Sequence, residues 1–226
     1  MAYWWALMIG NSRLHWGQFQ GSLLEGIRHT PHSVIPDEVT NLICVASVVP
    51  SQTTWIQSQL PQAKPMTLAD IPLKNIYPQL GIDRALAVWG ASQVYGYPCL
   101  VIDGGTALTF SGVDGSLAWA GGAILPGLQL QFTSLAQYTA ALPEVRLPAQ
   151  LPQRWAHETP EAITSGITYT LLAGIQDFIA AWQQRFPHSP IISTGGDGHW
   201  IAQNLPGVVH DPNLIFHGFA TLIQES

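Results

Sequence analysis

Two short polar segments, each placed directly after an apolar run, carry residue types suited to binding phosphate. The later segment is Asp103-Gly104-Gly105-Thr106, which follows Leu100-Val101-Ile102. The earlier one is Gly10-Asn11-Ser12, which follows Leu7-Met8-Ile9. Glycine removes the side-chain barrier to close approach, so main-chain N–H groups and hydroxyls can surround phosphate oxygens. The repeated pattern predicts two related lobes, each offering a β-hairpin turn to a shared active-site cleft.

A carboxylate and a guanidinium lie side by side in Gly81-Ile82-Asp83-Arg84, at the start of a predicted helix. Taken alone, this arrangement is also consistent with an ordinary helix cap, in which Asp83 caps and Arg84 is solvated. Three further segments are candidates for ligand contact. They are a predicted loop in which Gly122 and Gly127 bracket Pro126, a predicted N-cap at Thr159, and Thr194-Gly195-Gly196 at the end of a strand.

The composition limits the classes of function. Charged residues make up 10% of the 226 residues, against about 25% in an average globular protein. The net charge is −6 with only eight Lys and Arg, which argues against nucleic acid as a partner because backbone phosphates need clustered cations. No apolar stretch approaches the roughly 18–20 residues of a membrane span. With Cys44 and Cys99 in apolar runs and no visible signal peptide, we expect a cytoplasmic protein with reduced thiols.

The hydrophobic pattern predicts strands followed by helices, twice over, with Pro98 as the boundary between lobes 1–98 and 99–226. This order predicts an α/β fold with a mixed sheet in each lobe. The predicted strands cover 5–9, 13–19, 26–29, 42–48, 99–103, 107–111, 116–120 and 190–193, and the predicted helices cover 53–60, 84–95, 128–136, 159–181 and 213–224.

In this order and spacing, the segments resemble the type III pantothenate kinases over nearly the whole chain, from Leu7 through Gly218. The motifs that carry the resemblance are Gly10-Asn11-Ser12, Gly81-Ile82-Asp83-Arg84, Asp103-Gly104-Gly105-Thr106, Gly122-Ala123-Ile124-Leu125-Pro126-Gly127, Thr159-Pro160-Glu161-Ala162-Ile163 with Gly166, and Thr194-Gly195-Gly196.

The resemblance implies a fold of the acetate and sugar kinase/actin superfamily, with two duplicated ribonuclease H-like lobes. It also implies an enzyme that phosphorylates pantothenate to 4′-phosphopantothenate with ATP, the first step of coenzyme A biosynthesis. The implied cofactors are Mg²⁺ and a monovalent cation, K⁺ or NH₄⁺, and the implied assembly is a homodimer.

Individual roles follow from the matched motifs. Asp83 matches the general base, Arg84 a residue that binds the pantothenate carboxylate, and Asp103 the ligand of the monovalent cation. The remaining substrate contacts implied are Tyr77, Gly81, Ile82 and, across a dimer interface, Thr159. The implied ATP contacts are Met8, Ile9, Gly10, Asn11, Ser12, Arg13, Leu14, His15 and Thr106.

The chain departs from the family pattern at three positions. Met8 stands where the first turn normally begins with Asp, and a thioether is a poor ligand for Mg²⁺. His15 stands at a position that is commonly Lys, which replaces a fixed charge with a group expected to titrate near neutrality. Ser111 stands where an Asp often occurs.

Three other functions compete with the kinase. The nearest is a non-catalytic regulatory relative of the same family, against which the presence of Asp83, Arg84, Asp103 and Thr159 argues. A sugar kinase would need more polar residues near Asp83 to read hydroxyl groups. A binding module of another class would have no need of two phosphate turns.

Overall fold

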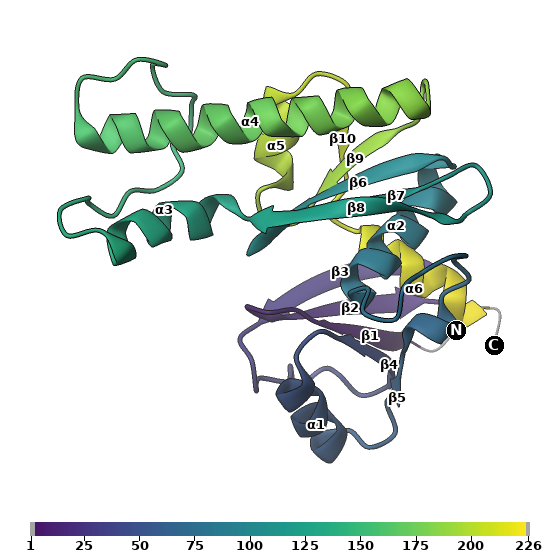
Figure 1. Ribbon diagram of the computed structural model, residues 1–226. Coiled ribbons are helices and arrows are strands. Elements are labelled where there is room, and N and C mark those ends of the chain that lie inside the picture. Colours follow the sequence, from purple (N-terminus) through teal and green to yellow (C-terminus); the bar gives the residue numbers. More distant parts are fainter. Residues whose placement is uncertain (1–2, 225–226) are drawn as a thin grey trace. The chain divides into compact units, whose positions relative to one another are not determined.

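The computed structural model describes residues 3–224 and contains two compact units, each built around a five-stranded sheet (Figure 1). The first unit comprises residues 1–99, 111–121 and 213–226. The second comprises residues 100–110 and 122–212. Both units therefore consist of separate stretches of the chain, whereas the lobes expected from the sequence are continuous.

The sheet of the first unit has the strand order β3-β2-β1-β4-β5. Its first three strands form an antiparallel meander, and β4 and β5 continue the sheet in parallel. The strands are β1 (Tyr3–Ile9), β2 (Leu14–Gln20), β3 (Leu23–Thr30), β4 (Leu42–Ser47) and the short β5 (Lys64–Pro65). The predicted first hairpin, third strand and buried fourth strand are confirmed.

Helices cover both faces of this sheet because β1 is apolar on both sides. One face, which includes Trp5 and Leu7, joins a buried cluster with Ile56 of α1 (Pro50–Gln59). On the other face Trp4 stacks on Phe19, with ring centroids 4.1 Å apart, and the ring of Phe19 lies 6.3 Å from that of Phe216 in α6 (Leu214–Gln224). The chain between α1 and α2 is irregular apart from β5 and a short 3₁₀ helix, Leu68–Asp70.

Helices α2 (Ile82–Tyr95) and α6 (Leu214–Gln224) approach each other backbone to backbone. A Cβ atom on Gly90 would overlap the main-chain oxygen of Leu214, and one on Gly218 would lie 2.7 Å from the main-chain oxygen of Leu86. Glycine at these two positions therefore permits a contact that any other residue would prevent. The contact joins the C-terminal helix to the first unit.

The sheet of the second unit has the order β10-β9-β6-β7-β8. Read from its other edge, as β8-β7-β6-β9-β10, this order matches that of the first sheet strand for strand. Strand β9 pairs in parallel with β6 and with β10, as β4 does with β1 and β5 in the first sheet. The strands are β6 (Cys99–Gly104), β7 (Ala107–Val113), β8 (Trp119–Pro126), β9 (Ile191–Thr194) and β10 (Val208–His210). The prediction of an α/β chain with two mixed sheets flanked by helices is confirmed.

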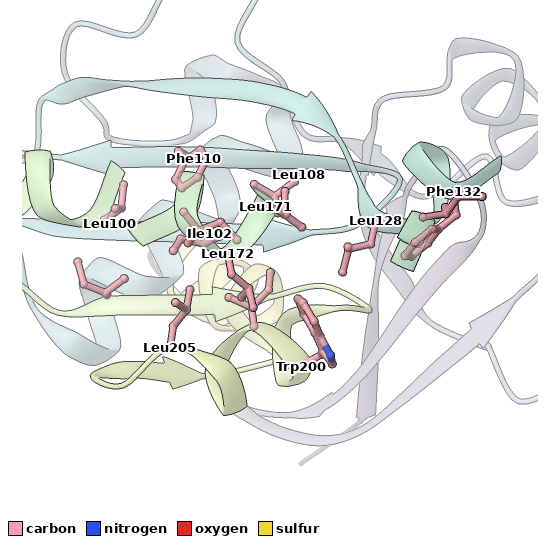
Figure 2. Close-up of a cluster of buried hydrophobic side chains, with 14 of the residues drawn as sticks. Leu100, Ile102, Leu108, Phe110, Leu128, Phe132, Leu171, Leu172, Trp200 and Leu205 are labelled. Atoms are coloured by element: carbon pink, nitrogen blue, oxygen red, sulfur yellow. The ribbon is translucent and has the colours of Figure 1, made fainter. Parts of the chain in front are cut away.

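Helices α3 (Leu128–Tyr138), α4 (Thr159–Arg185) and α5 (Gly198–Asn204) supply the rest of the second core. Figure 2 shows Ile102 and Leu108 of the sheet beside Leu171 and Leu172 of α4, with Trp200 of α5 nearby. Although α4 has 27 residues, no helix within residues 3–224 is both long and apolar enough to cross a membrane.

Two local expectations were wrong. Residues 121–126 belong to strand β8 and not to a loop, so the segment before Gly127 is held by sheet pairing. Thr159 is the first residue of α4, and Glu158 occupies the N-cap. The sequence reading also missed α5 and β10, which are too short for a clear hydrophobic period.

We predict that Gly90→Ala lowers the free energy of unfolding by at least about 3 kcal/mol, since the added methyl meets main-chain atoms that cannot rotate away. The matched control is Gly174→Ala in α4, where an added Cβ has nothing within 4 Å. The control should stabilise the protein by about 0.5–1 kcal/mol through helix propensity. Urea denaturation measures both, and an unchanged midpoint for Gly90→Ala would contradict the close contact.

Candidate functional site

The acid and guanidinium predicted from the sequence lie at the start of α2, in the first unit. Gly81 is the N-cap and Asp83 lies in the first helical turn. The Oδ1 atom of Asp83 accepts a hydrogen bond of 2.8 Å from the main-chain N–H of Arg84. A Cβ atom on Gly81 would overlap that same Oδ1. The glycine therefore leaves room for the carboxylate to turn back over the helix terminus.

Burial raises the pKa of Asp83 above its ordinary value. Hydrogen bonds from main-chain N–H groups and the charge of Arg84 act in the opposite direction, but more weakly. A carboxylate with a raised pKa is a stronger base than one in water. Asp83 is thus suited to accepting a proton from a hydroxyl group.

Arg84 is buried, and its guanidinium contacts the side chains of Ser111, Tyr77 and Trp119. Its Nε donates a hydrogen bond of 3.0 Å to the Oγ of Ser111, and its Nη1 donates one of 3.3 Å to the hydroxyl of Tyr77. Its Cζ lies 5.2 Å from the ring centre of Trp119, within the range of a cation–π interaction.

Main-chain hydrogen bonds bring Tyr77 and Trp119 together. The N–H of Lys74 donates to the oxygen of Leu117 at 3.0 Å, and the N–H of Trp119 donates to the oxygen of Lys74 at 2.8 Å. The rings of Tyr77 and Trp119 then meet edge to face at 6.1 Å. Sequence reasoning did not connect Ser111 or Trp119 with Arg84, because strand register and loop pairing decide these contacts.

The first predicted phosphate turn connects β1 and β2. The N–H of Gly10 donates to the oxygen of Arg13 at 3.1 Å, which closes the turn. Asn11, Ser12 and Arg13 are exposed at its tip. The side chains of Ile9 and Leu14 are buried in the core, and that of Met8 is only 2% exposed. The exposed part of the predicted ATP segment is therefore residues 11–13.

His15 differs from the expectation of a group that titrates near neutrality. It pairs across the sheet with Met8 on one side and with His29 on the other, and the two imidazole rings meet edge to face at 4.8 Å. Burial is the largest cause that lowers the pKa of His15 to about 4, and the neighbouring His29 and Arg13 act in the same direction. His15 is therefore neutral at physiological pH.

The second predicted turn connects β6 and β7 and lies against the segment after β9. The main-chain oxygen of Gly104 accepts a 2.8 Å hydrogen bond from the N–H of Asp197. Gly195 has a φ of +80°, and a Cβ atom there would overlap the Oδ1 of Asp103. The predicted Thr194-Gly195-Gly196 segment is thus brought to the carboxylate of Asp103.

Gly127 makes a similarly close contact with the tip of the second turn. Its N–H donates to the oxygen of Thr106 at 3.0 Å, and an added Cβ would overlap the oxygen of Gly105. The turn therefore contains one carboxylate, Asp103, and main-chain oxygens, and oxygen is the ligand type that hard cations prefer. Within residues 3–224 no group of three or more His, Cys, Asp or Glu side chains is arranged to hold a metal ion.

The other predicted contacts lie at separate places. Tyr77 is 40% exposed, Ile82 is buried, and Thr106 and Thr159 are exposed. Tyr77, Gly81, Ile82, Asp83 and Arg84 come together within the first unit. Asp103 and Thr106 share one turn of the second unit, and Thr159 begins its longest helix.

Sequence comparisons agree on one family. A family model described as type III pantothenate kinase matches residues 6–181. A type III pantothenate kinase of Synechococcus sp. (strain JA-2-3B'a(2-13)) is 43% identical over 228 residues, covering 96% of this chain and 87% of the relative. One from Nostoc sp. (strain PCC 7120 / SAG 25.82 / UTEX 2576) is 43% identical over 260 residues, covering 97% and 94%.

Solved structures share the fold at lower identity. A Baf family transcriptional activator from Campylobacter jejuni aligns with a TM-score of 0.69 and 21% identity, covering 98% of both chains. The activator of 2-hydroxyisocaproyl-CoA dehydratase from Clostridium difficile, solved with bound ADPNP, aligns with a TM-score of 0.53 and 9% identity, covering 99% and 94%. At these identities the likeness concerns the fold alone.

The lowered pKa of His15 predicts a pH dependence of stability. The unfolded chain takes up this proton near the ordinary pKa of 6.5, but the folded protein does so only at about 4. The stability that the neutral His15 contributes is therefore fully present above the pKa of the unfolded chain, and it is lost as pH falls towards the pKa of the folded protein. His15→Gln should reduce the loss of stability between about pH 7 and about pH 4.5, measured by urea denaturation. The exposed His157→Gln is the control, and an equal slope in both variants would contradict a neutral His15.

Proposed function

The chain belongs to the type III pantothenate kinases, and from this membership we propose that it transfers the γ-phosphoryl group of ATP to pantothenate. The observation that carries the proposal is the pairing of Asp83, whose pKa is raised, with the buried Arg84 at the start of α2. A general base beside a carboxylate-binding guanidinium suits an acceptor that has a hydroxyl at one end and a carboxylate at the other. The product, 4′-phosphopantothenate, begins coenzyme A biosynthesis.

In the proposed reaction the 4′-hydroxyl oxygen of pantothenate attacks the γ-phosphorus of ATP. A new P–O bond forms, and the bond from the γ-phosphorus to the bridging oxygen breaks, with its electron pair leaving on ADP. Asp83 accepts the hydroxyl proton. Because phosphoryl transfer passes through a loose transition state, positioning and electrostatics supply most of the rate.

Arg84 binds the acceptor's carboxylate in this proposal, since a planar fork of donors matches carboxylate geometry. Tyr77, Gly81 and Ile82 line the same site. The hydrogen bond between Arg84 and the Tyr77 hydroxyl supports a role for Tyr77 there.

The nucleotide is assigned to the two turns, with residues 8–15 and Thr106 as its contacts. The exposed tip at residues 11–13 supports this assignment for the first turn. Met8 has an uncharged thioether and His15 is neutral, so neither supplies a charge to the nucleotide. Mg²⁺ would accordingly be held mainly by the phosphates of ATP and by water, because this ion gives up its water ligands reluctantly.

The monovalent cation is assigned to Asp103, and the oxygen-rich turn around this carboxylate fits such an ion. When bound, K⁺ or NH₄⁺ would add positive charge near the phosphates. The residues that would hold it are Asp103 and main-chain oxygens of its turn. The glycines at 195 and 127 let the neighbouring segments approach Asp103 and the tip of this turn closely.

We also propose that the chain is a duplication of two ribonuclease H-like lobes, residues 1–98 and 99–226, each of which contributes the strands of one sheet. The matching strand order of the two sheets supports a duplication. The alternative is a non-catalytic regulatory relative of the same family. The intact Asp83, Arg84, Asp103 and Thr159 favour the kinase.

Asp83→Asn should lower kcat by about 10²–10⁴-fold, the usual contribution of a positioned base. The amide keeps the shape of the side chain, so pantothenate affinity should change little. The exposed Asp37→Asn is the control for the same chemical change. Steady-state kinetics with ATP and pantothenate decide the matter, and near-normal turnover of Asp83→Asn would remove this residue from the role of base.

Turnover in K⁺ or NH₄⁺ should greatly exceed turnover in Na⁺ at equal ionic strength, because the larger ions match a site of carbonyl and carboxylate oxygens. Asp103→Asn should weaken this preference by removing the charged ligand. Initial rates in the three chloride salts measure the effect. Equal rates for the wild type in all three would show that Asp103 serves another purpose.

We further propose a cytoplasmic homodimer in which Thr159 contacts the substrate bound to the other subunit. The low content of charged residues, 10%, supports a large interface. Sedimentation should give twice the mass of one chain. Mixing Asp83→Asn with Thr159→Arg should restore activity that neither variant has alone, since mixed dimers then contain one intact site. An active monomer would refute the shared site.

A further inference from the structure

We propose that Ser111 and Trp119 are positioning residues that orient the guanidinium of Arg84 toward the carboxylate of the acceptor. This inference rests on the proposed function of the site. It assigns roles to two residues that come from β7 and β8, well after Arg84 in the sequence.

Ser111 acts on the inner edge of the guanidinium. Its Oγ accepts the hydrogen bond from Nε at 3.0 Å, and the residue is only 1% exposed, so water does not compete for this contact. A hydrogen bond at Nε restricts rotation of the planar guanidinium about the axis of the side chain. The direction in which the two terminal nitrogens point is thereby set before the acceptor binds, which reduces the entropy lost on binding.

Trp119 acts on the face of the guanidinium. Its ring centre lies 5.2 Å from Cζ of Arg84 and 6.1 Å from the ring centre of Tyr77. It thus contacts both residues expected at the carboxylate end of the acceptor. The main-chain bond from the N–H of Trp119 to Lys74 ties this ring to the loop that carries Tyr77.

Both partners orient the guanidinium without bringing a negative charge. A hydroxyl and an indole face stabilise the cation, yet they leave its attraction for an acceptor carboxylate largely intact. This combination suits a residue that must be fixed in direction and still discriminate a carboxylate from a neutral group. Ser111 and Trp119 are therefore expected to influence which acceptors bind.

The test compares pantothenate with its primary amide, which keeps the hydroxyl end and lacks the charge. Ser111→Ala and Trp119→Leu should each raise KM for pantothenate about tenfold, the scale of one hydrogen bond or cation–π contact to a charged group. KM for the amide should change less than about threefold, as should kcat, because Asp83 is untouched.

Two further variants serve as controls. Trp119→Phe keeps an aromatic ring and should restore most of the discrimination between pantothenate and its amide. Ser116→Ala, in the turn between β7 and β8, should leave both KM values unchanged.

A second measurement does not depend on activity. In the wild type the Nε–H proton of Arg84 should exchange slowly with water, as seen by ¹⁵N NMR, and Ser111→Ala should abolish this protection. Equal rises of KM for both acceptors, or slow exchange retained in Ser111→Ala, would overturn the positioning role. A wild type that phosphorylates neither acceptor but shows the protected proton would instead overturn the proposed function alone.

Discussion

The burial of the Arg84 guanidinium is the constraint on which the first unit depends most. The residue is 7% exposed, and a buried charge without polar partners costs several kcal/mol. The fold offsets this cost by bringing three partners to the guanidinium: Tyr77 from a loop, and Ser111 and Trp119 from strands. The paired loop at Lys74 and strands β7 and β8 carry these three side chains to the guanidinium. The position of Asp83 follows, because it precedes Arg84 on the same helix.

Helix α2 also needs a rigid support, which α6 provides through main-chain contacts at Gly90 and Gly218. The two sheets then place a polar turn at the same point, after the first strand of each. Their chemistry differs: the first turn has exposed polar tips and a neutral His15, whereas the second gathers Asp103 and main-chain oxygens. One strand arrangement thus presents two turns of different chemistry, and the proposed cation site belongs to the second.

Much of this arrangement could be predicted from the sequence, because it depends on local pattern. Alternating apolar residues indicated the first hairpin, and helical spacing indicated α2 with Asp83 and Arg84 at its start. Contacts set by register could not be predicted: Ser111 reaches Arg84 across elements far apart in the chain. The pKa of His15 depends on its burial and on His29 from another strand. Gly122 and Gly127 on either side of Pro126 suggested a loop, but sheet pairing overrides weak strand propensity and extends β8 to Pro126.

The most direct test of the central claim is ³¹P NMR of the purified protein with ATP, Mg²⁺, K⁺ and pantothenate. The account predicts a new phosphomonoester signal coupled to the methylene protons next to the 4′-oxygen, growing in step with ADP. Omission of pantothenate should leave ATP unchanged. Release of ADP and inorganic phosphate without that phosphomonoester, or no change in ATP at all, would contradict the assignment of Asp83 and Arg84 to a pantothenate site.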